Sequence, residues 1–162
     1  MLIGIVGGES SLNRKLMLYA SKNLPSLVID CANAANPHSL FPAVDLDKLG
    51  QIYVIELELL YKFRDVLLRV PSIIRRLGIK CVIVTTSDHL FNYQDELENH
   101  NVMEHAWHLM KIISKKHNII VGIKAGSVHL KFASKYCDKL GRDNGTHCFE
   151  SKNDGRHYTI RA

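Results

Sequence analysis

Short apolar runs alternate with segments of helical periodicity along the chain, and this alternation restricts the fold more than any other feature. Residues 80–84 (KCVIV) form the clearest run, because a strand that is apolar at nearly every position is typical of a parallel sheet buried on both faces. Comparable runs occupy residues 2–6, 27–29, 52–55 and 119–123. Repeated strand–helix–strand units favour right-handed crossovers. The sequence therefore predicts an α/β fold with a mainly parallel sheet covered by helices on both sides.

The segments between these runs carry apolar residues at helical spacing. A first helix is expected after residue 8, capped by Ser10 or Ser11. A second is expected from about residue 56 to 77, bent or restarted near Pro71 and stopped by Gly78. Two more are expected over residues 102–117 and 130–140. Residues 146–150 and 157–161, around Asn153, Asp154 and Gly155, predict a C-terminal antiparallel hairpin.

The length of 162 residues suits one domain, and we expect it to span residues 1–162. No apolar run approaches the ~18–20 residues that a membrane-spanning helix needs. The first residues lack the basic leader of a signal peptide, and the four cysteines form no CxxC pair. These features predict a cytoplasmic protein with reduced, mostly buried thiols and no membrane contact.

Charge is distributed unevenly along the chain. Residues 1–110 carry 10 basic and 12 acidic side chains, a net charge of −2, whereas residues 111–162 carry 11 and 4, a net charge of +7. A basic C-terminal third on a nearly neutral body favours contact with a polyanion. A solvated surface without a partner is the alternative.

The first strand-to-helix turn comes close to a phosphate-binding loop. Such a loop needs glycines, a lysine for the terminal phosphates and a Ser or Thr hydroxyl for Mg²⁺. Aligned with GxxxxGK[ST], the chain keeps a glycine but departs at the other three positions: Gly8, Asn13, Arg14 and Lys15, with Gly7 just before them. Asn13 tolerates a left-handed backbone, Arg14 keeps the charge in another geometry, and Lys15 has no hydroxyl.

Two further parts of a hydrolytic site are missing. The central strand is followed by Thr85 where an NTPase places an aspartate, and no carboxylate occurs before Asp88. The second strand ends at Asp30, and Ala32 stands where a base would activate water. The sequence therefore predicts a vestigial nucleotide site and no ATP hydrolysis.

At the level of element order, the chain resembles the RecA/RadA recombinase superfamily, particularly the archaeal RadA/RadB-like paralogs. The glycine turn with its helix (residues 7–20), the strand at residues 27–30 and the strand ending before Thr85 are similar to the first units of that family. Residues 102–124 resemble the following helix–strand pair, and residues 146–161 resemble the closing hairpin. The resemblance implies a three-layer, RecA-like (P-loop NTPase-type) fold without the N-terminal domain of recombinases.

The resemblance also implies a function. With degenerate Walker A and Walker B motifs, the chain looks like a non-catalytic recombinase paralog that binds single-stranded DNA, a recombinase or another paralog in homologous recombination and DNA repair. A homo-oligomer is a further option. The resemblance allows ATP as a ligand, but we expect no cofactor.

In that family the loop after the strand at residues 119–123 faces DNA. Here the loop contains Lys124, and His129 stands at the start of the next helix. Four basic residues then recur at helical spacing and predict one stripe: Lys131, Lys135, Lys139 and Arg142. We assign these six residues to DNA binding, with a merely solvated stripe as the alternative. Phe132, Tyr136 and Leu140 share the helical period and favour a core face over base stacking.

Other functions have weaker support. His105 and His108 share a helix face without a Cys or carboxylate at a recognised ligand spacing, so we predict no metal site. An acidic cluster, Asp95, Glu96 and Glu98, lies in the loop after the central strand at residues 80–84. Its negative charge argues against DNA contact at this loop. Two alternatives remain open: a nucleotide-binding, ATPase-like enzyme in which Arg14 supplies the charge, and a scaffold that pairs with a catalytic paralog.

Overall fold

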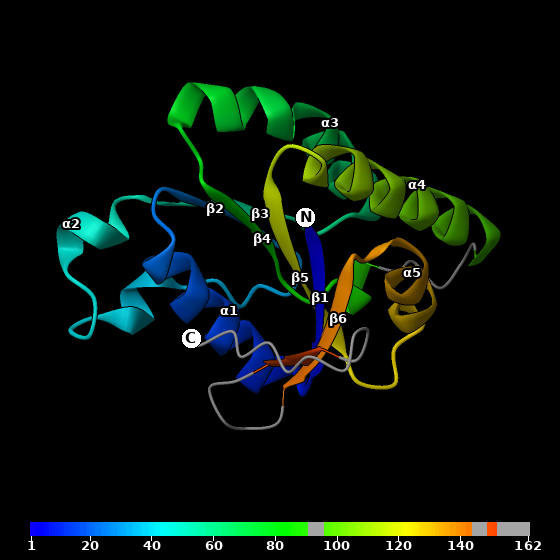
Figure 1. The fold of residues 1–162 in the computed structure, drawn as a ribbon, viewed down its shortest axis with the longest axis horizontal. Helices are drawn as coiled ribbons and strands as arrows, with labels where there is room; N and C mark the ends of the chain where they lie inside the picture. Colours follow the sequence, from blue (N-terminus) through cyan, green and yellow to red (C-terminus); the bar gives the residue numbers. More distant parts are fainter. Residues whose placement is uncertain (91–95, 144–148, 152–162) are drawn as a thin grey trace.

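The computed structural model describes residues 1–90, 96–143 and 149–151. Within these residues a sheet has the strand order β3-β2-β4-β5-β1-β6-β7 (Figure 1). Six strands run parallel: β1 (Leu2–Gly7), β2 (Ser26–Asp30), β3 (Ile52–Glu56), β4 (Cys81–Val84), β5 (Asn118–Lys124) and β6 (Lys139–Asp143). The mainly parallel α/β sheet predicted from the sequence is therefore confirmed.

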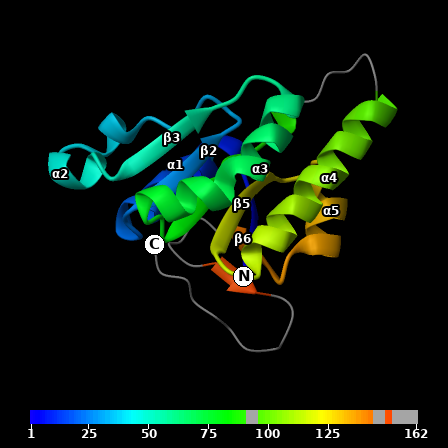
Figure 2. The same ribbon diagram turned by 90° about the horizontal axis from the view of Figure 1, so that it is seen from above.

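Helices cover both faces of this sheet. On one face α1 (Glu9–Lys22) packs with the short segments η1 (Pro37–Leu40) and α2 (Leu46–Leu49). On the other face lie α3 (Leu60–Leu77), α4 (Glu96–Ser114) and α5 (His129–Tyr136), with α3 and α4 side by side (Figure 2). Among the described residues, no helix has the length and apolar character required to cross a membrane.

The central strands are apolar because they are buried on both faces. Val82, Ile83 and Val84 of β4 have no exposed surface, and β5 is buried from Ile119 to Ile123. Cys31 and Cys81 are buried free thiols, as predicted, and burial raises the pKa of Cys81 to about 12. Cys148 lies outside the described residues.

The first two helices differ from the prediction at their ends. α1 begins at Glu9 with Gly8 as its N-cap and without a side-chain cap, so the predicted cap at Ser10 or Ser11 is wrong. α3 begins at Leu60 because β3 continues to Glu56, and it runs through Pro71 without restarting. Its buried face of Phe63, Leu67, Val70 and Ile74 packs on the sheet and keeps the helix continuous across the proline. Gly78 ends it with a left-handed backbone (φ +65°), as the glycine indicated.

The largest correction concerns residues 130–140. The helix α5 ends at Tyr136, and Lys139, Leu140 and Arg142 belong to strand β6. Pairing of Ile3–Lys139 through Val6–Arg142 covers the edge of β1 that β5 leaves open, and this pairing prevails over the helical period of the lysines.

The predicted C-terminal hairpin falls mostly outside the described residues. Its turn and second strand, at residues 153–161, cannot be compared with the structure. The short strand β7 (Phe149–Ser151) pairs antiparallel with β6 at the end of the sheet.

A substitution at Gly4 tests the position of β6, because side chains pack closely around this residue. A Cβ atom there would lie 2.8 Å from both Ile123 Cδ1 and Leu140 Cδ1, and 2.9 Å from Cys137 Sγ. We expect Gly4→Ala to lower the free energy of unfolding by about 1–3 kcal/mol, because three side chains must move in a filled core. Urea denaturation measures the loss. Gly50→Ala is the matched control, since its Cβ would meet ordinary contacts at 3.7 Å. Equal stability of the two variants would contradict the close packing of Gly4 against these three side chains.

Candidate functional site

The candidate site lies at the carboxyl ends of β1, β4, β5 and β6, where parallel sheets bind ligands. α1 begins directly after β1, and the N–H of Leu12 donates to the carbonyl of Gly8 at 2.9 Å. Residues 9–13 therefore form the first turn of a helix instead of an open loop. A phosphate-binding loop would need these residues to curl around the anion with their N–H groups facing inward. Only the N-terminus of α1 remains as an anion-binding feature of this turn.

A carboxylate of the chain itself stands at that helix N-terminus. Glu9, the first residue of α1, contacts the imidazole of His89, and Oε2 lies 3.0 Å from Nζ of Lys124. Burial by itself raises the pKa of Glu9, but hydrogen bonds and charges from Lys124 and His89 outweigh it and hold the pKa below its ordinary value. The cations nearest to this turn are therefore engaged with an internal anion.

Lys15 is engaged in the same way. Its Nζ lies 2.5 Å from Oδ1 of Asp143 at the end of β6, and the two side chains are 14% and 2% exposed. Gly7 has a packing role beside this pair, because a Cβ there would lie 2.8 Å from Cβ of Asp143. Gly7, Lys15 and Asp143 thus join α1 and β1 to β6.

Asn13 has a structural role as well. It is helical and 2% exposed, and its amide makes two hydrogen bonds to one residue. Nδ2 donates to Oγ1 of Thr86 at 3.0 Å, and the N–H of Thr86 donates to Oδ1 at 3.1 Å. The interpretation of Asn13 as a left-handed loop residue is wrong, because the residue lies inside α1 and ties it to the segment after β4.

Thr85 stands where the resemblance placed the Walker B aspartate, and it is fully buried. Its hydroxyl donates to Oδ1 of Asp30 at 2.9 Å and accepts from the N–H of Cys31 at 2.7 Å. Asp30 also accepts from the N–H groups of Ala32 and Ala35. This network closes the loop after β2 and leaves neither group directed at a ligand. Arg14 is exposed on α1, and no ion pair of Arg14 occurs among the described residues.

The six residues assigned to DNA do not form one stripe. Lys124 contacts Glu9, and His129 is 2% exposed, so its ring is not on the surface. Lys135 pairs with Glu104 at 2.5 Å, which raises the pKa of Lys135. Lys139 and Arg142 lie on β6, and Lys131 is exposed on α5. The helical stripe predicted through Lys139 and Arg142 is therefore wrong.

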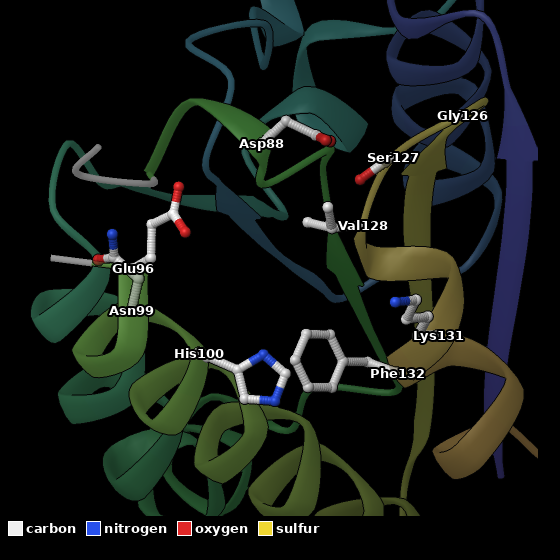
Figure 3. Close-up of a pocket in the computed structure, with 9 residues that line it drawn as sticks. All are labelled: Asp88, Glu96, Asn99, His100, Gly126, Ser127, Val128, Lys131 and Phe132. Atoms are coloured by element: carbon white, nitrogen blue, oxygen red, sulfur yellow. The ribbon is translucent and has the colours of Figure 1, made fainter. Parts of the chain in front are cut away.

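A cavity of about 500 Å³ opens between the start of α4 and the segment that leads from β5 into α5 (Figure 3). Its lining includes Asp88 of the short helix η2 (Asp88–Leu90), Glu96 and His100 of α4, and Lys131 and Phe132 of α5. The rings of His100 and Phe132 lie 5.0 Å apart. Phe132 also stacks on Trp107 at 6.4 Å and is mostly buried, as its helical period indicated.

The charge of this cavity is mixed. Oδ2 of Asp88 is buried and has no hydrogen-bond partner among the described residues. At the first residue of α5, burial lowers the pKa of His129, while the negative charge of Asp88 acts in the opposite direction. Lys131 lines the same cavity as the carboxylates of Asp88 and Glu96.

Sequence reasoning missed the anionic partners of these cations: Glu9, Asp143 and Glu104. Glu9 carried a readable signal, because an acidic residue in the first turn of a helix is stabilised by the helix dipole. Asp143 and Glu104 carried none, since their partners are 128 and 31 residues away in the chain.

No protein-family model matches this chain, and none of the curated proteins compared with it does. In residues 1–90, 96–143 and 149–151, no three His, Cys, Asp or Glu side chains gather as metal ligands would.

The pairing of Asn13 with Thr86 can be tested by stability. We expect Asn13→Ala to lower the free energy of unfolding by about 1–3 kcal/mol, because a buried hydroxyl and a buried N–H would lose their partner. Asn101→Ala, at an exposed position of α4, is the matched control and should change stability little. Thermal and urea unfolding measure both. A loss at Asn13 no larger than at Asn101 would contradict the paired arrangement.

The lowered pKa of Glu9 predicts a pH dependence. A carboxyl group whose pKa is lower in the folded state stabilises the fold above its unfolded pKa, and that stabilisation disappears as pH falls through the folded pKa. We therefore expect Glu9→Gln to be less stable than the parent chain at neutral pH, with the difference shrinking below about pH 4.3. Urea denaturation from pH 7 to 3 measures it, with the exposed Glu58→Gln as control. A difference independent of pH would rule out the charged contact.

Proposed function

We propose that this chain is a RecA-like domain that does not hydrolyse ATP and acts by binding, as an accessory in homologous recombination and DNA repair. One observation carries the non-catalytic part: the carboxylate of Glu9, held by His89 and Lys124, stands at the helix N-terminus that a nucleotide phosphate would need. A phosphate entering there would meet a negative charge instead of free cations.

The strand order supports the RecA-like assignment. β5 lies between β1 and β4, so the turn after β1 and the segment after β4 flank a single strand at the carboxyl edge. Three of the positions compared with a hydrolytic site serve structure instead: Asn13 binds Thr86, Thr85 binds Asp30, and Lys15 pairs with Asp143.

We assign the ligand to single-stranded DNA, a recombinase or both. For DNA, the supporting feature is that the exposed residues Lys131 and His100 line the same cavity. Strands bound without sequence preference use cations for phosphates and aromatic faces for bases. Asp88 and Glu96 repel phosphates, so the DNA backbone is expected on the side of Lys131.

The alternative, an ATPase-like enzyme, rests on Arg14, which is exposed in the second turn of α1. Calorimetry with ATP and Mg²⁺, together with a phosphate-release assay, separates the two functions. We expect no binding heat and no turnover. A Mg²⁺-dependent binding signal that Arg14→Ala removes would favour the enzyme.

A salt series with a single-stranded oligonucleotide tests the DNA assignment. We expect affinity to fall steeply with salt, and Lys131→Ala to reduce the slope of log affinity against log salt by about 0.7, the share of one phosphate contact. Lys135→Ala should act less, because Glu104 already holds that lysine. Lys62→Ala, an exposed lysine of α3, is the charge-matched control.

Failure to bind single-stranded DNA at low salt would refute the DNA assignment. Co-purification of the full chain from its native host tests the protein partner, and recovery of a recombinase supports that part.

A further inference from the structure

Exposed cations gather at the amino edge of the sheet, opposite to the site described above. Three helices end there, because α1, α3 and α4 lead into β2, β4 and β5. In Figure 1 the ends of α3 and α4 that lead into β4 and β5 lie at the same edge as the N-terminus of the chain. We name this group the amino-edge cluster, and each member is exposed: Lys22, Arg75, Arg76, Lys80, Lys115 and Lys116.

The backbone brings Lys80 to the entrances of β2 and β5. The N–H of Lys80 donates to the carbonyl of Pro25 at 2.8 Å, which joins the entrance of β4 to that of β2. On the other side, Cys81 is in register with Asn118, so Lys80 stands beside the turn that follows Lys115 and Lys116. The backbone nitrogen of Met1 donates to the carbonyl of His117 at 3.1 Å, which places the start of β1 at the same edge.

Acidic residues are scarce around this cluster. The sequence contains no Asp or Glu in residues 10–29, 66–87 and 105–137, which include all six members. None of the six forms an ion pair among the described residues. Near this edge Asp138 contacts Lys111 and Asp45 lies 3.1 Å from Lys48, while Asp47 of α2 is exposed. Among the described residues the six cations therefore have no acidic partner, unlike Lys15 and Lys124 at the carboxyl edge.

Helix dipoles explain part of the cluster. Arg75 and Arg76 lie in the last turn of α3, where a cation gains about 0.3–1 kcal/mol from the negative helix end. Lys80 lies beyond Gly78, outside the helix, and gains little because the effect falls off within the last turn. Mutual repulsion of these cations is relieved when an external anion binds.

We propose that the amino-edge cluster binds the phosphate backbone of nucleic acid without sequence preference. Neighbouring strands lie about 4.8 Å apart, so the starts of β2, β4 and β5 place their cations along a row of about 10 Å. Each strand of duplex DNA presents one phosphate per about 3.4 Å of helix axis, so a row of this length matches several phosphates. A single small anion would instead require donors that converge on one point, and the cluster's side chains spread along an edge.

This inference goes beyond the proposed function, because it depends neither on the RecA-like resemblance nor on Lys131. Lys131 belongs to α5, after the carboxyl end of β5, whereas Lys115 and Lys116 precede its amino end. The two surfaces can therefore be tested by separate variants of the full chain.

The test compares fluorescence anisotropy of labelled single-stranded and duplex oligonucleotides with four proteins. These are the parent chain, Lys131→Ala, the triple variant Lys80→Ala/Lys115→Ala/Lys116→Ala, and a control triple variant Lys62→Ala/Arg64→Ala/Arg69→Ala within α3, with the same loss of charge. We expect the amino-edge variant to lose at least tenfold in affinity and about 2 in the single-strand salt slope, as three lost phosphate contacts imply. The control triple should lose much less, and thermal unfolding verifies that all four fold.

The outcomes separate this inference from the proposed function. Loss of affinity in the amino-edge triple supports the inference, and an unchanged Lys131→Ala would then refute the DNA contact proposed at the cavity. Loss only in Lys131→Ala, equal loss in both triples, or no binding by the parent chain overturns the inference. Binding of the parent chain to anionic lipid vesicles but not to oligonucleotides overturns it too.

Discussion

The burial of the central strands on both faces is the constraint on which the rest of the structure depends. β4 and the middle of β5 contain no charged side chain, and β2 contains only Asp30 at its carboxyl end, because each strand is paired on both sides and covered by helices above and below. Polar chemistry is therefore confined to the two ends of the strands and to the outer helix surfaces. The two ends differ in how their charged side chains are paired. Cations at the carboxyl end contact acids of the chain, whereas the six cations of the amino-edge cluster form no ion pair among the described residues.

At the turn after β1, charged groups of the chain are paired with one another. Glu9 forms ion pairs with His89 and Lys124, and Asp143 forms one with Lys15. Asp30 accepts a hydrogen bond from the hydroxyl of Thr85. An anion would have to displace a carboxylate that is already positioned by the fold and shares its helix N-terminus. Because like charges repel strongly where water is partly excluded, a polyphosphate gains little at this turn. The same contacts fasten α1 to β6 and to the segments after β4 and β5, so what resembles an eroded active site serves the stability of the sheet.

The sequence predicted the sheet well and the site poorly, for physical reasons that particular residues show. Burial leaves a local signature, and the run Cys81–Val84 was recognisable as a buried strand because every position faces the core. Lys139 and Arg142 continued the spacing of Lys131, yet they belong to β6, because the open edge of β1 pairs with them. The residues around Lys139 and Arg142 carry no local sequence pattern that predicts this pairing with β1. Asn13 likewise looked like a loop residue only because its partner Thr86 is 73 residues away.

Charge in the chain is best interpreted through its partners. The net charge of +7 in residues 111–162 pointed to α5, but the structure pairs Lys111, Lys124 and Lys135 with acids. Lys115 and Lys116 have no such ion pair among the described residues, and the fold sets them beside Lys80 and the end of α3. Charges screened by salt beyond about 10 Å act on an incoming polyanion mainly when they lie close together and are not cancelled by a neighbour. The six cations of the amino-edge cluster are divided among three helix ends in the sequence, and none of them forms an ion pair within the described residues, whereas Lys135 of the predicted stripe is paired with Glu104.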